Sequence, residues 1–323
     1  MAYSSGKTFV IAADPAAPPP GLAGAVAAIG NFDGVHRGHL AVIRRAQDLA
    51  KCLGAPSAVL TFEPHPADVF KGPNTVFRLT PQDAKAKILE RLGLDGMIVV
   101  TFDKALANLP AESFISEVLA RRLGLRAIVA GYDFHFGANR AGSPDFLREA
   151  GKRHGLAVEI VPRVPAEEGG SGEPASSTAA RAALEAGDAE RAARLLGHPF
   201  AIMGKVIHGQ ERGRTLGFPT ANLLPDPSCR LRHGVYAVRV AIGEREYDGV
   251  ASYGRRPTFD NGRALLEVFL FDFSGDLYGA FIEVRFIGWI RPEEKFESAD
   301  ALIAQMNKDA ARAREILARS PSC

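Results

Sequence analysis

Two histidines that are three residues apart follow a short apolar run in this 323-residue chain. His36 and His39 flank Gly38 in the segment 30–39 (GNFDGVHRGH), and a helical pattern comes directly after it. Glycine lets a backbone approach a ligand closely, and the first turn of a helix offers unpaired N–H groups and a positive dipole end. Imidazole rings add hydrogen-bond donors. The segment predicts a phosphate-binding site; the alternative is a glycine-rich turn with two surface histidines.

A second segment of this kind opens the C-terminal half, where 204–209 reads GKVIHG and 212–222 reads RGRTLGFPTAN. A basic, glycine-rich loop can cover phosphates with backbone N–H groups, although the chain contains no G-x-x-x-x-G-K-[ST] motif. Thr220 and Asn222 are two residues apart, so on an extended chain they face the same side. Their oxygens suit Mg²⁺. The alternative is a plain β-turn.

One acidic residue stands out farther along the chain. Glu267 interrupts the otherwise apolar run 265–271, where it occupies either a functional position or the solvent-facing position of an alternating strand.

The N-terminal half alternates strand and helix patterns, which predicts a parallel sheet with helices on its faces. The expected strands are 25–29, 58–62, 96–100, 127–130 and 158–161. The expected helices are 39–53, 81–93, 111–124 and 146–154, and two short ones follow at 178–185 and 188–196. For the second helix, Thr80 is the expected N-cap and Pro81 the first helical residue.

From residue 201 onward, short alternating runs predict an all-β domain, a small barrel or a sandwich. These runs are 201–208, 235–242, 247–252, 265–271 and 282–287, and Ser298 is expected to cap a final helix that ends near 317. We place the domain boundary at residue 186, which gives domains 1–186 and 187–323.

Composition limits the classes of partner. Hydrophobic residues make up 46%, charged residues 24%, and the net charge is +2, so nothing supports a nucleic-acid-binding surface. The three cysteines are far apart, which argues against disulfides or a cysteine zinc site. With no apolar run of about 20 residues and no secretory signal, we expect a cytoplasmic protein without membrane or nucleic-acid partners, as a monomer or weak homo-oligomer.

The segment 30–39 resembles the signature of the nucleotidyltransferase superfamily, and its wording is similar to the FMN adenylyltransferase module of bacterial bifunctional riboflavin kinase/FAD synthetases. Segments 61–66 (TFEPHP), 131–137 (GYDFHFG) and 176–178 (SST) follow in the order of that family. The resemblance implies a Rossmann-like domain in which FMN phosphate attacks the α-phosphorus of ATP, with Mg²⁺, to give FAD and pyrophosphate. It implies that His36, His39 and Arg181 are catalytic. It assigns ATP binding to Gly30, Phe32, Asp33, Gly34, His36, Gly38, His39, Ser176, Ser177, Thr178 and Arg181, and flavin binding to Glu63, His65 and Asp133.

The string 212–222 resembles the riboflavin kinase signature, and 234–237, 256–259, 277–279 and 291–293 follow in family order. The resemblance implies a small antiparallel barrel with a C-terminal helix that phosphorylates riboflavin with ATP, with Glu267 as the base. It assigns Mg²⁺ to Thr220 and Asn222. It assigns ATP binding to Gly204, Lys205, His208, Gly209, Arg212, Gly213, Arg214, Gly217, Pro219 and Thr220.

The chain also departs from the family pattern. Alanines at 175, 179 and 180 replace bulkier or basic residues, His135 stands where Arg is common, and Ser252 and Phe269 stand where Asn and His are frequent. Two rival hypotheses therefore remain: a kinase whose N-terminal half has become a scaffold, and a flavin- or nucleotide-binding sensor without turnover.

Overall fold

The computed structural model describes residues 8–164, 175–208, 218–255 and 264–320. Its internal contacts divide the chain into two compact units. The N-terminal unit comprises the chain up to 76 together with 80–175, and the C-terminal unit comprises 77–79 together with the chain from 176 onward. The functional boundary at residue 186 stays a prediction.

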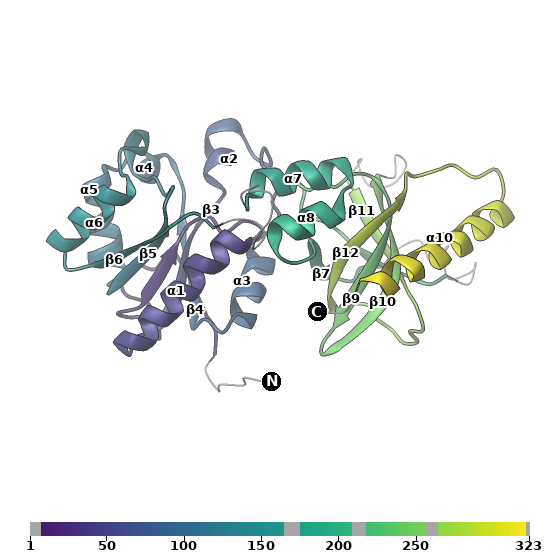
Figure 1. Cartoon of the computed structure of the whole chain (residues 1–323), viewed down its shortest axis with the longest axis horizontal. Helices are drawn as coiled ribbons and strands as arrows, with labels where there is room; N and C mark the ends of the chain where they lie inside the picture. The colour runs from purple at the N-terminus through teal and green to yellow at the C-terminus, as the bar shows by residue number, and fades with distance from the viewer. Residues whose placement is uncertain (1–7, 165–174, 209–217, 256–263, 321–323) are drawn as a thin grey trace. The chain divides into compact units, whose positions relative to one another are not determined.

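The N-terminal unit is built on a parallel sheet, which confirms the predicted α/β class (Figure 1). Within the described residues the strand order is β1-β4-β3-β2-β5-β6. The strands are β1 (Val10–Ala13), β2 (Val26–Ile29), β3 (Ser57–Glu63), β4 (Gly96–Thr101), β5 (Ala127–Gly131) and β6 (Ala157–Val161). Five of them were predicted. The edge strand β1 was not, because its four residues are at best half-buried and too few to show a period.

The chain order reverses at β2, which lies between β3 and β5. In an open α/β sheet, ligands bind beyond the carboxyl ends of the strands at such a switch point. The predicted N-terminal site residues other than those of 176–181 lie at the end of β3, in the loops that follow β2, β3 and β5, or in the first turn of α1.

Alternate residues of β2 face two separate apolar clusters. Val26 and Ala28 pack with α1 (Arg37–Leu53) and α3 (Gln82–Arg91), whereas Ala27 and Ile29 pack against the other helical layer. That layer contains η1 (Phe114–Arg122) and α6 (Pro144–Arg153). The unit also has short helical segments, namely α2 (Pro66–Lys71), α4 (Lys104–Ala107), α5 (Ala111–Ser113) and η2 (Ala138–Arg140). The central strands β2, β3, β4 and β5 are therefore buried on both faces.

Two helix predictions need correction. The helix expected at 111–124 begins as α5 and continues as the π-helix η1. A π-helix has wider turns than an α-helix, and the spacing of apolar residues over nine positions is too short to distinguish the two. Thr80 is not the N-cap of α3, because Pro81 takes that place and the Thr80 hydroxyl contacts the β2–α1 loop instead.

The C-terminal unit is an antiparallel sheet with the order β7-β12-β9-β10-β11-β8 across the described residues. The strands are β7 (Ala201–Lys205), β8 (Thr220–Leu223), β9 (Gly234–Ile242), β10 (Arg245–Arg255), β11 (Ala264–Leu270) and β12 (Phe281–Arg291). Just past β7, Ile207 N–H donates to Asn222 O of β8 at 2.8 Å. This bridge joins the two edges of the curled sheet, as expected for a small barrel.

The helices of this unit in its described segments are α7 (Ser177–Ala186), α8 (Ala189–Leu196) and α10 (Ala299–Arg319). Helix α10 is capped by Ser298, as predicted, since the Ser298 Oγ accepts from Ala301 N–H at 3.1 Å. It packs through Ala313 and Leu317 on the outer face of the sheet, next to Ala237.

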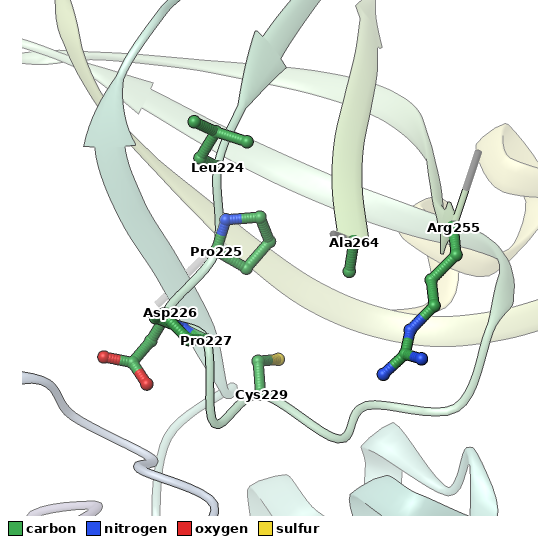
Figure 2. Close-up of a pocket in the computed structure, with 7 residues that line it drawn as sticks. All are labelled: Leu224, Pro225, Asp226, Pro227, Cys229, Arg255 and Ala264. Carbon is green, nitrogen blue, oxygen red and sulfur yellow. The ribbon is translucent and has the colours of Figure 1, made fainter. Parts of the chain in front are cut away.

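A pocket of 170 Å³ lies beyond the end of β8 (Figure 2). Its lining consists of Leu224, Pro225, Asp226, Pro227, Cys229, Arg255 and Ala264. None of the predicted site residues is among them.

Candidate functional sites

The two histidines predicted to bind phosphate lie together where α1 begins. His36 is the N-cap, and its Nδ1 accepts the backbone N–H of His39 at 3.2 Å. The two rings stack with centroids 3.6 Å apart and planes 16° from parallel. Because Nδ1 of His36 is an acceptor, the neutral ring carries its proton on Nε2. The helix start therefore combines backbone N–H groups with imidazole donors, a suitable environment for an anion.

The backbone of the preceding loop adopts unusual conformations. Phe32 and Val35 have φ angles of 49° and 41°, in the left-handed region that costs energy for residues other than glycine. A Cβ on Gly38 would lie 3.1 Å from Cε1 of His36, so a larger residue would push the capping ring away. The glycine at 38 thus follows from the position of His36.

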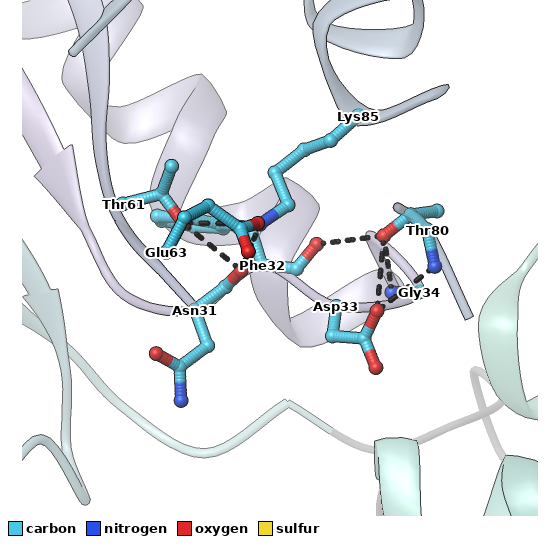
Figure 3. Close-up of polar contacts among 8 residues, drawn as sticks. All are labelled: Asn31, Phe32, Asp33, Gly34, Thr61, Glu63, Thr80 and Lys85. Atoms are coloured by element: carbon cyan, nitrogen blue, oxygen red, sulfur yellow. Dashed lines mark hydrogen bonds and ion pairs between the residues drawn. The ribbon is translucent and has the colours of Figure 1, made fainter. Parts of the chain in front are cut away.

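Asp33, a predicted ATP contact, is buried and bonded within the protein (Figure 3). Its Oδ1 accepts the N–H of Thr80 at 2.8 Å, and the Thr80 hydroxyl accepts the N–H of Gly34 at 2.9 Å. These bonds fasten the loop to the chain just before α3. The role of Asp33 in binding ATP stays a prediction.

Lys85 was missed by the sequence analysis. It lies on α3, is 1% exposed, and its Nζ donates to Asn31 O at 2.8 Å and to Thr61 Oγ1 at 3.1 Å (Figure 3). It also pairs with Glu63 Oε1 at 3.3 Å. A signal existed in the sequence, because Lys85 is four residues before the buried Leu89 and so shares its helix face.

The three predicted flavin-binding residues follow β3 and β5. Glu63 ends β3, and His65 caps α2 by accepting Ala67 N–H on Nδ1 at 3.2 Å. Asp133 is exposed in the loop after β5. They therefore lie at the carboxyl edge of the sheet, on the two strands that neighbour β2.

The predicted ATP-binding residues of 176–181 start α7, in the C-terminal unit. The Ser176 Oγ accepts Ala179 N–H at 3.3 Å, so this hydroxyl caps the helix. Ser177 and Thr178 form the first turn. The Arg181 Nε donates to Phe77 O at 2.7 Å, within the same unit.

Strand register aligns the candidate kinase residues. Asn222 of β8 lies opposite Glu267 of β11, which lies opposite Ser252 of β10. Directly opposed residues of antiparallel strands share a face of the sheet, and Thr220 lies on that face with Asn222. The sheet thus brings together a carboxylate, an amide and a hydroxyl.

Asn222 is 4% exposed, and its Oδ1 is buried without a hydrogen-bond partner among the residues that the structure describes. Its Nδ2 donates to Thr220 O at 3.4 Å. A buried acceptor left unsatisfied costs about 1–3 kcal/mol. A hard cation at this oxygen would remove that cost, so the donor set fits Mg²⁺.

Other predicted kinase residues are only partly described. Gly204 and Lys205 end β7, Pro219 precedes β8, and the exposed His208 stacks on Tyr278 with ring centroids 3.8 Å apart. Some predicted residues lie outside the described part of the chain: Gly209, Arg212, Gly213, Arg214, Gly217 and the segment 256–259.

Two features are absent from residues 8–164, 175–208, 218–255 and 264–320. No group of three or more His, Cys, Asp or Glu side chains there is arranged to hold a metal ion. Nor does any helix in these ranges have the length and apolarity needed to cross a membrane.

Comparisons with known proteins match both halves of the chain. The FAD synthetase family model matches residues 19–179, and the riboflavin kinase family model matches 196–317. A bifunctional riboflavin kinase/FMN adenylyltransferase of Pseudomonas fluorescens is 42% identical over 306 residues, covering 92% of this chain and 94% of that protein. The protein of the same description from Escherichia coli strain K12 is 43% identical over 293 residues, covering 90% and 92%.

A solved structure agrees in fold over both units. It is described as a macrolide-efflux protein from Streptococcus pneumoniae, with a TM-score of 0.79 and 32% identity, and the match covers 97% of this chain and all of that one. Two relatives above 40% identity and two family models in the expected order agree on the same family. The chain therefore belongs to the family of bifunctional riboflavin kinase/FMN adenylyltransferases.

Proposed function

We propose that this chain performs the two reactions of its family at two separate sites. Riboflavin and ATP give FMN and ADP on the β8–β11 face, and FMN and ATP give FAD and pyrophosphate at the β2–α1 loop. The observation that carries the proposal is the pair of unlike polar clusters in different units, His36 with His39 and Asn222 with Glu267.

In the adenylyl transfer, a phosphate oxygen of FMN attacks the α-phosphorus of ATP and the bond to pyrophosphate breaks. No covalent intermediate with the protein is required, so catalysis consists of alignment and charge stabilisation. The start of α1 and the Nε2 side of His36 supply donors to ATP. Glu63, His65 and Asp133 hold the flavin. The donors that Ser176, Ser177, Thr178 and Arg181 of the C-terminal unit would add to ATP stay a prediction.

In the kinase reaction, the Glu267 carboxylate accepts the proton of the riboflavin 5′-hydroxyl as that oxygen attacks the γ-phosphorus of ATP. Thr220 and Asn222 would hold Mg²⁺, which neutralises phosphate charge when bound. The buried, unsatisfied Asn222 oxygen supports this assignment. The proposal further includes a cytoplasmic enzyme that acts on small molecules, as a monomer or weak homo-oligomer without nucleic-acid or membrane partners.

The test is a flavin chromatogram after incubation with riboflavin, ATP and Mg²⁺. We expect FMN and then FAD from the unaltered protein. His39→Ala should stop FAD formation and spare FMN formation, whereas Asn222→Ala should stop FMN formation and still convert supplied FMN to FAD. If either substitution abolished both reactions in folded protein, the two-site proposal would fail. Tight flavin binding without turnover would favour the sensor hypothesis.

A further inference from the structure

The buried Lys85 ammonium lies between a loop and a strand end that both contribute to the proposed adenylyltransferase site (Figure 3). It reaches the carbonyl of Asn31 in the β2–α1 loop, and it also reaches Thr61 and Glu63 at the end of β3. An ammonium has three donors, and these three acceptors lie within 3.3 Å of it. Lys85 therefore ties the loop proposed for ATP to the strand end proposed for the flavin.

Burial of this lysine needs an explanation. Lysine is rarely buried completely, because removing an ammonium from water is costly unless it is paired and hydrogen-bonded. Packing alone would be served equally well by an apolar residue, as at Ala84, Ala86 and Leu89 on the same helix. A charged group at position 85 points to a task that an apolar residue does not perform.

The β2–α1 loop, which Lys85 contacts, has unfavourable backbone angles. Phe32 and Val35 both have positive φ values, and such conformations persist when surrounding contacts impose them. The contacts come from residues 80–85: Thr80 binds Gly34 and Asp33 at one end of the loop, and Lys85 binds the Asn31 carbonyl at the other. His36 and His39 follow directly from this loop.

We propose that Lys85 is a positioning residue for adenylyl transfer. It fixes the Asn31 carbonyl and thereby the orientation of the loop that presents His36 and His39 to ATP. This inference rests on the proposed function of the N-terminal unit. Because the ammonium is buried and bonded to three acceptors of the protein, its effect on the reaction passes through the loop.

Lys85→Met keeps the length of the side chain and removes its charge and its donors. We expect kcat for FAD formation from FMN and ATP to fall about 100-fold, because small displacements of aligning groups have effects of that size. The KM for ATP should change much less, since the helix start and the histidines remain present. Riboflavin phosphorylation by the same preparation should be unchanged.

A double-substitution cycle with Glu63→Gln separates positioning from simple charge pairing. Lys85→Met alone leaves the Glu63 carboxylate without this cation, which lowers stability. The Lys85→Met/Glu63→Gln protein lacks both charges of this ion pair, so its unfolding midpoint should return toward that of Glu63→Gln. If Lys85 positions the loop, kcat in the double variant should remain about 100-fold below that of Glu63→Gln.

The matched control is Lys87→Met, which alters an exposed lysine on the same helix and should change no measurement. Recovery of kcat in the double variant would overturn the proposal, because Lys85 would then serve only to neutralise Glu63. Wild-type activity in Lys85→Met would overturn it as well. These two outcomes can be observed only if the unaltered protein makes FAD. If the unaltered protein made no FAD, the proposed function of the N-terminal unit itself would be wrong.

Discussion

At the residue scale, several polar side chains that were predicted to contact ligands form hydrogen bonds with the backbone of the N-terminal unit. Asp33 accepts from Thr80, His36 caps α1, and His65 caps α2. A sequence motif shows which residue types occur together, and it does not separate a residue that touches a ligand from one that shapes the loop. The clearest example is Gly38, where an added Cβ would lie 3.1 Å from the His36 ring and would shift it.

Gly38→Ala should therefore impair adenylyl transfer. The added methyl group would lie 3.1–3.2 Å from the His36 ring and would displace the ring from its bond to His39 N–H. We expect FAD formation to fall at least about 10-fold, because misplaced aligning groups reduce rate strongly, with FMN formation unchanged. Arg44→Ala, at an exposed position of α1, is the control in the same assay. An equal FAD rate in Gly38→Ala would contradict the steric argument.

The buried tyrosines predict an alkaline limit of stability. Burial raises the pKa of Tyr236 and of Tyr253 well above the ordinary value of about 10. Because the folded-state pKa is the higher one, the contribution of these residues is complete below about pH 10 and is lost as pH rises from there. The free energy of unfolding of the C-terminal unit should fall steeply between pH 10 and 11, measured by urea denaturation.

Tyr236→Phe checks this assignment. It removes one ionisable group, so stability should decline less steeply above pH 10, although the lost hydrogen bond to Arg232 O costs about 1 kcal/mol at neutral pH. Tyr132→Phe, an exposed tyrosine of the other unit, should leave the alkaline slope unchanged. The same slope in Tyr236→Phe as in the unaltered protein would rule out this source of the pH dependence.

At the scale of elements, α10 is fixed to the barrel by charge as well as by apolar contact. Arg291, at the end of β12, donates to both carboxylate oxygens of Asp309 at 2.9 and 2.7 Å, and Gln305 donates to the same carboxylate at 2.9 Å. The carboxylate raises the pKa of Arg291 further above its ordinary value. Arg239 also donates to Leu317 O at 2.9 Å, near the end of the helix.

Asp309→Ala should detach part of this helix. The substitution removes both carboxylate bonds from Arg291, which is 15% exposed and keeps Glu294 at 3.9 Å, so we expect a cost of about 1–3 kcal/mol. Urea denaturation should show a lower midpoint for the C-terminal unit only. Glu315→Ala breaks an exposed pair with Arg312 on the same helix and should cost below about 0.5 kcal/mol. Equal effects of the two substitutions would refute the difference between buried and exposed pairs.

At the scale of the whole molecule, the two units are not consecutive stretches of sequence. The segment 77–79 is part of the C-terminal unit, although it interrupts the chain of the N-terminal one. Phe77 is 0% exposed, its ring centroid lies 5.8 Å from that of Phe200, and the N–H of Arg78 donates to Ser228 Oγ at 2.9 Å. The C-terminal unit thus contains three residues that no linear boundary would include.

Phe77→Ala should accordingly destabilise the C-terminal unit. Loss of a fully buried phenylalanine costs about 3–5 kcal/mol, so riboflavin phosphorylation should be lost at a lower temperature than in the unaltered protein. Phe70→Ala, at a 68% exposed position of the same sequence region, is the stability control. A lower inactivation temperature for adenylylation alone would show that Phe77 stabilises the other unit.

The sequence by itself determined the two fold classes, most of the strands and the family. Local periodicity indicates which face of a strand or helix is buried. The two signature segments, 30–39 and 212–222, are each an unbroken stretch of sequence and can be recognised without the fold. Tertiary structure decided what depends on distant partners: the pairing of Asn222 with Glu267, the burial of Lys85 beneath the β2–α1 loop, and the inclusion of Phe77 in the C-terminal unit. Each joins residues at least 45 positions apart, beyond the reach of any local pattern.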